Sequence, residues 1–266
     1  MTRRTASILA LAFAGASLLS AQTANPVQWY TGTASKVKPG MMDAYLKQMA
    51  ILKKVYQSRK DAGEIKSWAL YRVIAPTGAN NEFDVVNMIL WPKRAEIDPD
   101  VLTKMNAPYW QKVGLSQAQF AAQMREIATI VRTSVSVRHM EAGTFGVGDL
   151  IRVDYVKIEP GTLGEYINRL RTVYKPLNEA DIQGGSLKAW AMHSFVYPGG
   201  TDRPADAYTI HAFNSSDQMF SRGPAGGGAA AFAKVHPGLN YLQTTNRQNE
   251  IRKSVRSIAL KQIDGI

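Results

Sequence analysis

The sequence predicts an α+β fold built from two tandem copies of one β-α-β-β-α-β unit. Short segments recur in the same order in both halves of the chain, which is typical of an internal duplication. Strand-like and helix-like hydrophobic periodicities also alternate in the same order in each half. With 266 residues, 45% of them apolar, the chain is long enough for two small domains. We assign residues 26–141 to the first repeat and residues 147–266 to the second.

The recurring segments lie at the start of a helix, on a strand and in the turn that follows this strand. Pairwise, they are Pro39-Gly40 and Pro160-Gly161, Lys66-Ser67-Trp68 and Lys188-Ala189-Trp190, and Pro76 and Pro198. Matches in constant order with nearly constant spacing indicate that one unit was duplicated.

Each element of the first repeat follows from a local pattern. Residues 29–37 are strand-like, and the helix that follows has a buried stripe at 3.6-residue spacing from Met42 to Tyr56. Residues 67–74 and 83–91 predict two further strands, separated by turn-forming residues. A second helix is expected to run from Phe120 to Ile130, and residues 133–139 predict the last strand.

The second repeat shows the same order of elements. Residues 149–158 predict a strand, and apolar residues from Leu163 to Leu177 predict the helix after it. Residues 189–197 and 207–213 predict the central strands. The second helix has a weaker signal in this repeat, and residues 252–260 are the candidate for the last strand.

Elements in this order form the ferredoxin-like, or split βαβ, unit. The antiparallel sheet of such a unit carries helices on one face only, so its other face must be covered. We expect the two antiparallel sheets to pack face to face as a pseudo-dimeric α-β barrel within one chain, with a cleft between the sheets. On the recurring segments given above, the sequence resembles the dimeric α-β barrel superfamily in a fused, two-copy form.

This resemblance implies a ligand site, because ligands in the superfamily usually lie between the sheet and the helices or in the cleft between the sheets. It does not imply one reaction. The superfamily includes cofactor-free monooxygenases, isomerases, haem-degrading enzymes, haem peroxidases and stress-response proteins, and fold alone fixes no chemistry. No set of catalytic residues of the superfamily matches this sequence position by position.

The N-terminal residues have the pattern of an export signal. Two arginines precede an apolar run from Ile8 to Leu19, and small residues follow it. This order predicts a cleaved secretory signal peptide at residues 1–21. Cleavage after Ala24 and an uncleaved membrane anchor are the alternatives. We therefore expect an exported protein, periplasmic or extracellular, with no integral membrane segment after signal cleavage.

The composition excludes several classes of function. Cysteine is absent, which excludes thiol catalysis, disulfides and cysteine metal sites. The formal net charge of +11 favours anionic partners. The basic residues are scattered without a nucleic-acid-binding motif, so we expect no nucleic-acid partner. The histidines lack a spacing typical of metal ligands, so we assign no metal site, and the cofactor stays open.

Alternation along the strands sorts the side chains into two faces. In residues 149–158, polar Arg152 and Asp154 alternate with apolar Ile151 and Val153. We expect the apolar face to pack on helices and the polar face to line the cleft between the sheets. Applied to all central strands, this sorting predicts a cleft lined by Arg152, Asp154, His193, His211, Tyr71 and Asn87.

These residue types predict roles in proton transfer and anion binding. Histidine titrates near neutral pH, so His193 and His211 are candidate catalytic residues, with Asp154 orienting an imidazole. Arg152 is a candidate anchor for an anionic substrate group. Tyr71 and Asn87 (both polar and on the same predicted face) complete the predicted substrate-binding set. The alternative is a satisfied hydrogen-bond network between the sheets, with no ligand.

Three functions are compatible with this pattern. The first is an enzyme that acts on a small anionic or aromatic molecule by isomerase or cofactor-free oxygenase chemistry. The second is a protein that binds a small ligand, haem included, without turnover. The third is a structural or stress-related envelope protein whose cleft is filled by its own side chains. A pocket lined by the predicted residues would favour the first two.

Overall fold

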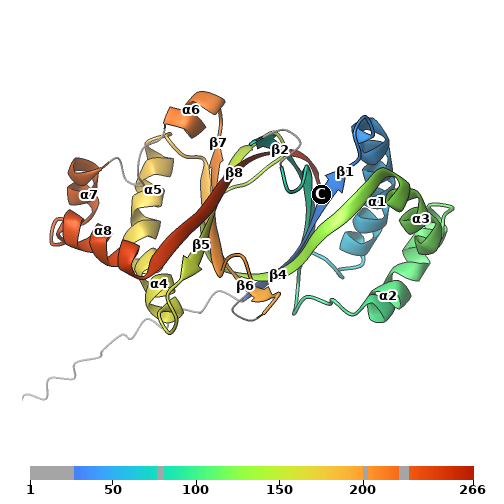
Figure 1. Cartoon of the computed structure of the whole chain (residues 1–266), viewed down its shortest axis with the longest axis horizontal. Coiled ribbons are helices and arrows are strands. Elements are labelled where there is room, and N and C mark those ends of the chain that lie inside the picture. Colours follow the sequence, from blue (N-terminus) through green and yellow to red (C-terminus); the bar gives the residue numbers. More distant parts are fainter. Residues whose placement is uncertain (1–26, 77–80, 200–202, 222–227) are drawn as a thin grey trace, which may run out of the picture.

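Eight strands of the computed structural model form one closed antiparallel barrel, with helices on the outside (Figure 1). The structure describes residues 27–76, 81–199, 203–221 and 228–266, so the predicted signal peptide at residues 1–21 lies outside the described part. The elements of the first half are β1 (Gln28–Val37), α1 (Met42–Asp61), β2 (Ser67–Ala75), β3 (Val85–Trp91), α2 (Pro99–Lys112), α3 (Gln117–Ile127) and β4 (Ala128–Gly143).

The second half has the same order of strands as the first, but its helical segments are broken into more and shorter helices. Its elements are β5 (Leu150–Ile158), α4 (Leu163–Arg169), the π-helical turn η1 (Leu170–Tyr174), α5 (Lys175–Gln183), β6 (Ala189–Tyr197), β7 (Ala207–Phe213), α6 (Ser216–Ser221), α7 (Ala229–Val235), α8 (Tyr241–Glu250) and β8 (Arg252–Gly265). The stretch with a weak helix signal thus contains three short helices.

Most of the predicted elements are present, and the differences are the unpredicted helix α2 and the boundary between α3 and β4. β6 and β7 have the predicted bounds. α2 was not predicted, although Asp98 begins it by accepting hydrogen bonds from the amides of Asp100 and Val101. Ile130 was expected on a helix, but it lies on β4 and is 65% exposed. Ile130 lies three residues after the end of α3 and continues its apolar spacing, so the predicted helix was too long.

The two halves of the barrel are joined edge to edge. The strand order around the barrel is β1-β3-β2-β8-β5-β7-β6-β4. Antiparallel hydrogen bonds join β2 to β8 and β4 to β6. The α+β class and the barrel are confirmed, whereas the hydrogen-bonded joining of the two sheets along both seams was not part of the prediction. The sheets are continuous along both seams, and a closed barrel leaves no unpaired edge.

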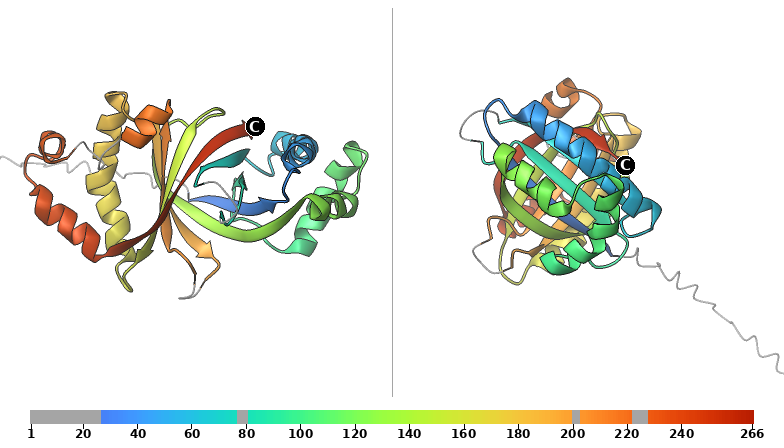
Figure 2. Two further views of the ribbon diagram at one scale, coloured as in Figure 1. Left: turned by 45° about the horizontal axis from the view of Figure 1, so that its top comes forward. Right: turned by 90° about the vertical axis from the view of Figure 1, so that its right-hand side faces the viewer.

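The helices cover the outside of the barrel in two groups. In Figure 2, α1, α2 and α3 lie against the first half, and α4, α5, α7 and α8 lie on the side of the second half. The predicted stripe of α1 is confirmed, because Tyr45, Met49, Leu52 and Val55 are all buried. None of the helices in the described ranges combines the length and the apolar character that a membrane crossing requires.

The inside of the barrel is a second apolar core. Ile151 and Val153 of β5 point into it and contact apolar residues from strands of both halves, including Val73 of β2 and Leu260 of β8. Each sheet therefore buries both of its faces, one inside the barrel and one beneath helices. Alternation along a strand separates these two faces, but it does not say which one lies inside.

A truncation in this interior core is expected to destabilise the protein. Leu260 lies opposite Val73 across the β2–β8 seam and is 4% exposed. Leu260→Ala should lower the free energy of unfolding by about 2–5 kcal/mol, because it leaves a cavity among packed side chains. Val255→Ala, at an exposed position on the same strand, should change it by less than about 0.5 kcal/mol. Urea denaturation measures both, and equal effects would contradict a packed barrel interior.

Candidate functional site

A pocket of about 270 Å³ lies between the barrel wall and the helices of the second half. β5, β7 and β8 form its wall side, and α4, η1, α5 and α8 contribute residues to its helix side. The polar and aromatic residues that define this second-half pocket include Arg152, Asp154, Tyr166, His211, Arg252 and Ser257.

Strand pairing places three of the six predicted site residues together in this pocket. β5 and β7 pair so that Arg152 lies opposite His211, and β5 and β8 pair so that Asp154 lies opposite Ser257. Side chains two residues apart on a strand share a face. The backbone hydrogen bonds therefore hold Arg152, Asp154 and His211 on one face without any contribution from a flexible loop.

Asp154 is the centre of the cluster. Its Oδ2 atom lies 3.3 Å from Nδ1 of His211 and 3.2 Å from Nε of Arg152. Its other carboxylate oxygen, Oδ1, accepts a hydrogen bond from the hydroxyl of Ser257. His211 is 6% exposed. One carboxylate thus contacts an imidazole, a guanidinium and a hydroxyl in a mostly buried place.

The surroundings keep the Asp154 carboxyl ionised. Burial by itself raises its pKa, but the hydrogen bond and charge of His211, the charge of Arg152 and the hydrogen bond from Ser257 together hold the pKa well below its usual range. An ionised carboxylate only accepts hydrogen bonds, so the contact at 3.3 Å favours the tautomer of His211 with its proton on Nδ1. In a neutral imidazole, Nε2 is then the atom that can accept a proton.

Arg252 adds a cationic group that the sequence had not singled out as a site residue. It lines the pocket, and its Nε atom is buried with no hydrogen-bond partner among the described residues. It stands next to Tyr166, whose pKa burial raises to about 12 against the lowering effect of Arg252. In the sequence, Arg252 only begins the last predicted strand, and nothing there marks it as a pocket residue.

Comparison with known proteins places this geometry in a known fold. No known protein family matches the sequence, and no curated protein sequence matches it either. Similar solved structures include an anthrone oxidase-like protein, with 11% identity and a TM-score of 0.54 over 90% of this chain and 92% of that chain. The chain has the dimeric α-β barrel fold. A mutant chlorite dismutase from Candidatus Nitrospira defluvii is also similar, with 7% identity and a TM-score of 0.50 over 89% of this chain and 91% of that chain.

The other three predicted residues of this α-β barrel lie in different places. His193 and Tyr71 point to the inside of the barrel. Asn87 lies beneath the helices of the first half, where its Oδ1 accepts a hydrogen bond from Nε1 of Trp68. The expectation of one cleft shared by all six residues is therefore wrong.

The six residues were wrongly assigned to one cleft because the barrel interior is as apolar as the face that the helices cover. Ile151 and Val153 were expected to pack on helices, but they point into the barrel. Arg152, Asp154 and His211 consequently face the helices, which is the reverse of the prediction for β5 and β7. For β6 and β2 the prediction holds, because Trp190 packs on the helix side and His193 lies opposite.

A larger pocket, of about 740 Å³, lies between the barrel wall and the helices of the first half. Its walls are mainly apolar and include Met49, Phe120 and Met124. Three buried polar atoms of its lining residues have no hydrogen-bond partner in the described part of the chain. They belong to Asn106, Trp110 and Gln117. The sequence reasoning missed this first-half pocket because it missed α2, which carries Asn106 and Trp110.

Neither pocket fits haem. Sites for drug-sized ligands span about 300–1,000 Å³, and the second-half pocket, which contains His211, has only about 270 Å³. The first-half pocket is larger, but no histidine is among its described lining residues. Within the described ranges, no three histidine, aspartate or glutamate side chains lie close enough to hold a metal ion.

The low pKa of Asp154 makes a pH-dependent contribution to stability. Because its folded-state pKa lies below the ordinary value of about 3.9, the cluster stabilises the folded state above about pH 4 and loses this contribution as the pH falls further. Asp154→Asn should lower the free energy of unfolding by about 1–3 kcal/mol at pH 7, and by less at pH 3. Asp43→Asn, at an exposed carboxylate on α1, is the control and should be neutral within about 0.5 kcal/mol. Urea denaturation at both pH values measures this, and a loss that is larger at pH 3 would contradict the assignment.

Proposed function

We propose that this protein is an enzyme that abstracts a proton from a small organic anion in the second-half pocket. The contact between the buried His211 and the partly buried Asp154 is the observation that carries the proposal, because Asp154 orients the imidazole through Nδ1, and an imidazole oriented in this way can accept a proton. Proton abstraction is the step shared by isomerisation and by cofactor-free oxygenation of an acidic substrate. The fold shared with an anthrone oxidase-like protein supports this class of chemistry.

The charges around the pair support an anionic substrate. Arg252 has a buried Nε atom free to donate, and Arg152 lies beside Asp154. A guanidinium matches the geometry of a carboxylate, so these side chains can hold the anionic group. The substrate proton passes to Nε2 of His211, and the charge of the resulting imidazolium is balanced by Asp154. The aromatic rings of Tyr166 and Tyr174 in the lining suit a flat or aromatic substrate.

Loss of the proposed base should abolish proton abstraction. Phenylpyruvate is an anionic aromatic probe with acidic protons next to its carbonyl group. In D₂O the enzyme should exchange these protons, which NMR can follow. His211→Gln should lower the exchange rate by about 10²–10⁴-fold, whereas Arg252→Gln should mainly raise KM, by about tenfold, because it removes an anchor rather than the base.

His139→Gln is the matched control. His139 lies on β4, where its Nε2 pairs with the hydroxyl of Ser194, and it does not line the second-half pocket. The His139→Gln variant should exchange the protons of phenylpyruvate at the same rate as the unchanged protein. Thermal unfolding of each variant separates loss of activity from loss of folding. Equal exchange by the unchanged protein and by folded His211→Gln would overturn the proposal.

Carriage of an apolar aromatic ligand in the first-half pocket is a second candidate function. The three unpartnered polar atoms of Asn106, Trp110 and Gln117 favour it, since buried polar groups normally have hydrogen-bond partners and a ligand can supply them. This candidate needs no turnover, and its ligand-binding residues are separate from His211. The exchange measurement above therefore distinguishes the two functions.

We further propose that the protein is exported and that its halves are duplicated ferredoxin-like units forming a pseudo-dimer. The basic and apolar pattern of residues 1–21 supports export to the periplasm or the extracellular space. The matching strand order of the two halves supports the duplication.

Cleavage of the signal is directly measurable. When the full chain is produced in a Gram-negative bacterium, the protein should appear in the periplasmic fraction, and its N-terminal residue should be Gln22. Leu11→Arg interrupts the apolar run and should retain the uncleaved chain in the cytoplasm. Val27→Arg, beyond the signal, should be exported normally. An uncleaved chain in the cytoplasm without any substitution would contradict the export signal.

A further inference from the structure

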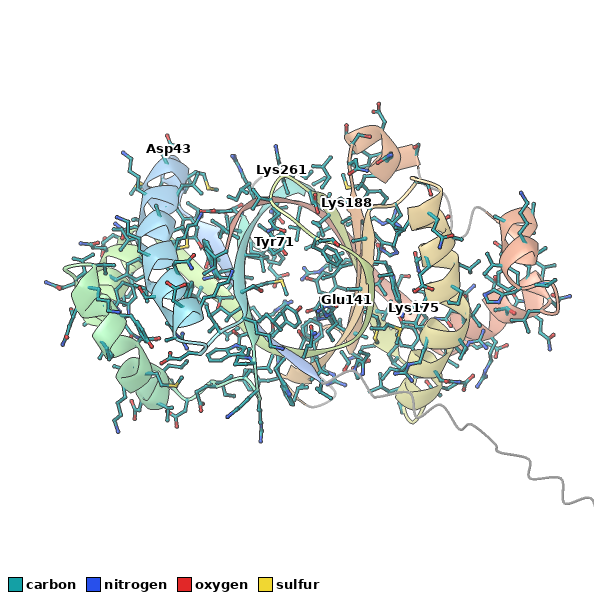
Figure 3. All side chains as sticks on the ribbon, turned by 180° about the vertical axis from the view of Figure 1, so that it is seen from behind. Asp43, Tyr71, Glu141, Lys175, Lys188 and Lys261 are labelled. Atoms are coloured by element: carbon teal, nitrogen blue, oxygen red, sulfur yellow. The ribbon has the colours of Figure 1, made fainter. Side chains whose placement is uncertain are left out.

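The inside of the barrel holds a third cavity, separated from the second-half pocket by the barrel wall. It has a volume of about 600 Å³ and lies at the end of the barrel where residues 143–147 and the C-terminus meet. Figure 3 shows Tyr71 on the inner side of the ring of strands, in line with its place in the interior core. The interior residues that shape this lumen cavity include Tyr30, Tyr71, Met88, His193, Ile210 and Gln262.

His193 is the most buried polar residue of the lumen cavity. It is 1% exposed and packs between two tyrosine rings, with centroid distances of 4.9 Å to Tyr30 and 4.8 Å to Tyr208. Its Nδ1 atom has no hydrogen-bond partner anywhere in the described part of the chain. Burial, reinforced by Arg138 and His139, lowers the pKa of His193 well below its ordinary value. The imidazole is therefore neutral at neutral pH and able to accept a hydrogen bond.

Gln262 supplies a second unpartnered polar atom. It lies on β8, is 7% exposed, and its Oε1 atom has no hydrogen-bond partner among the described residues. Leaving two buried polar groups of one cavity unpaired is costly, and native structures normally satisfy such groups with protein, water or ligand. Both residues line the same cavity, so one ligand can contact both.

The charges of the lumen cavity are compensated within the protein. Arg138 forms an ion pair with Glu141. At the nearby connection between β4 and β5, Lys188 forms an ion pair with Asp149. With Arg138 and Glu141 paired, the charged side chains that line the cavity are balanced, and the other lining residues offer aromatic walls and hydrogen-bonding atoms. This differs from the second-half pocket, where Arg252 has a free donor.

We propose that the lumen cavity binds an uncharged aromatic compound that carries a hydroxyl group, with the O–H donating a hydrogen bond to Nδ1 of His193. The tyrosine rings and apolar side chains contact the aromatic part, and Gln262 contacts the same polar end. This site is independent of the proton-abstraction site, because the two lie on opposite faces of the barrel wall.

Three related probes test the ligand class by isothermal titration calorimetry at pH 7. 2-Naphthol has the aromatic body and an uncharged hydroxyl, naphthalene lacks the hydroxyl, and 2-naphthoate carries a charge. 2-Naphthol should bind at one site, and each of the other two should bind at least about tenfold more weakly, because a site built for a hydrogen bond rejects the analogue that cannot make it. Absence of saturable 2-naphthol binding, or tighter binding of naphthalene or 2-naphthoate, would overturn the proposal.

Variants locate the binding site within the protein. His193→Phe keeps an aromatic ring but removes the acceptor, and it should weaken 2-naphthol binding about tenfold or more while leaving naphthalene binding unchanged. Gln262→Leu should also weaken 2-naphthol binding, and it provides the test if His193→Phe does not fold. Unchanged 2-naphthol affinity in a folded lumen variant would overturn the proposal.

Two controls exclude the other pockets. Ala121→Phe narrows the first-half pocket, and His211→Gln alters the second-half pocket. Both should bind 2-naphthol with the affinity of the unchanged protein. If either control, and not the lumen variants, loses 2-naphthol binding, the ligand occupies that pocket and the lumen proposal is wrong.

Discussion

Closure of the barrel by hydrogen bonds along both seams is the constraint on which the rest of the structure depends. Because β2 pairs with β8 and β4 pairs with β6, no face of either sheet is left for solvent. One face lies inside the barrel and the other lies beneath helices. Away from the strand ends, a polar side chain that points to either face is then at least partly buried, and burial without a partner is costly. Polar residues gather in three separate places, which are the second-half pocket, the first-half pocket and the lumen cavity.

The order and type of the elements could be predicted from the sequence because they depend on local periodicity. A stripe of apolar residues at helical spacing predicted α1. Alternation of polar and apolar residues predicted the strands, and β6 and β7 were predicted with their observed bounds. Helix α2 escaped prediction because its apolar stripe is weak and its start is marked mainly by Asp98. The barrel itself was expected from the duplication, but the pairing of strands along its seams was not, since pairing between β2 and β8 joins residues far apart in sequence and leaves no local pattern.

The candidate site could be predicted only in part. Arg152, Asp154 and His211 were grouped correctly, because the strand register that unites them follows from alternation and from pairing of neighbouring strands. His193 was grouped with them wrongly, since it lies across the barrel wall. Alternation divides the side chains of a strand between two faces, but it does not say which face lies inside the barrel. Here both faces also pack against apolar residues, so hydrophobicity does not distinguish them. Arg252 was not recognised because its importance comes from a buried, unpartnered nitrogen, which only packing reveals.

Comparison of the two halves explains why the ionisable cluster beneath the helices lies in the second half. β1 pairs with β3 in the same register in which β5 pairs with β7, so Thr31 opposite Ile89 corresponds to Arg152 opposite His211. Two residues further along, β5 carries Asp154 where β1 carries a threonine. The same backbone thus supports an ionisable cluster beneath one set of helices and a mainly apolar pocket beneath the other. A backbone that fixes position but not chemistry is compatible with the proton transfer that we propose for one half and with the binding of apolar groups that we propose for the other.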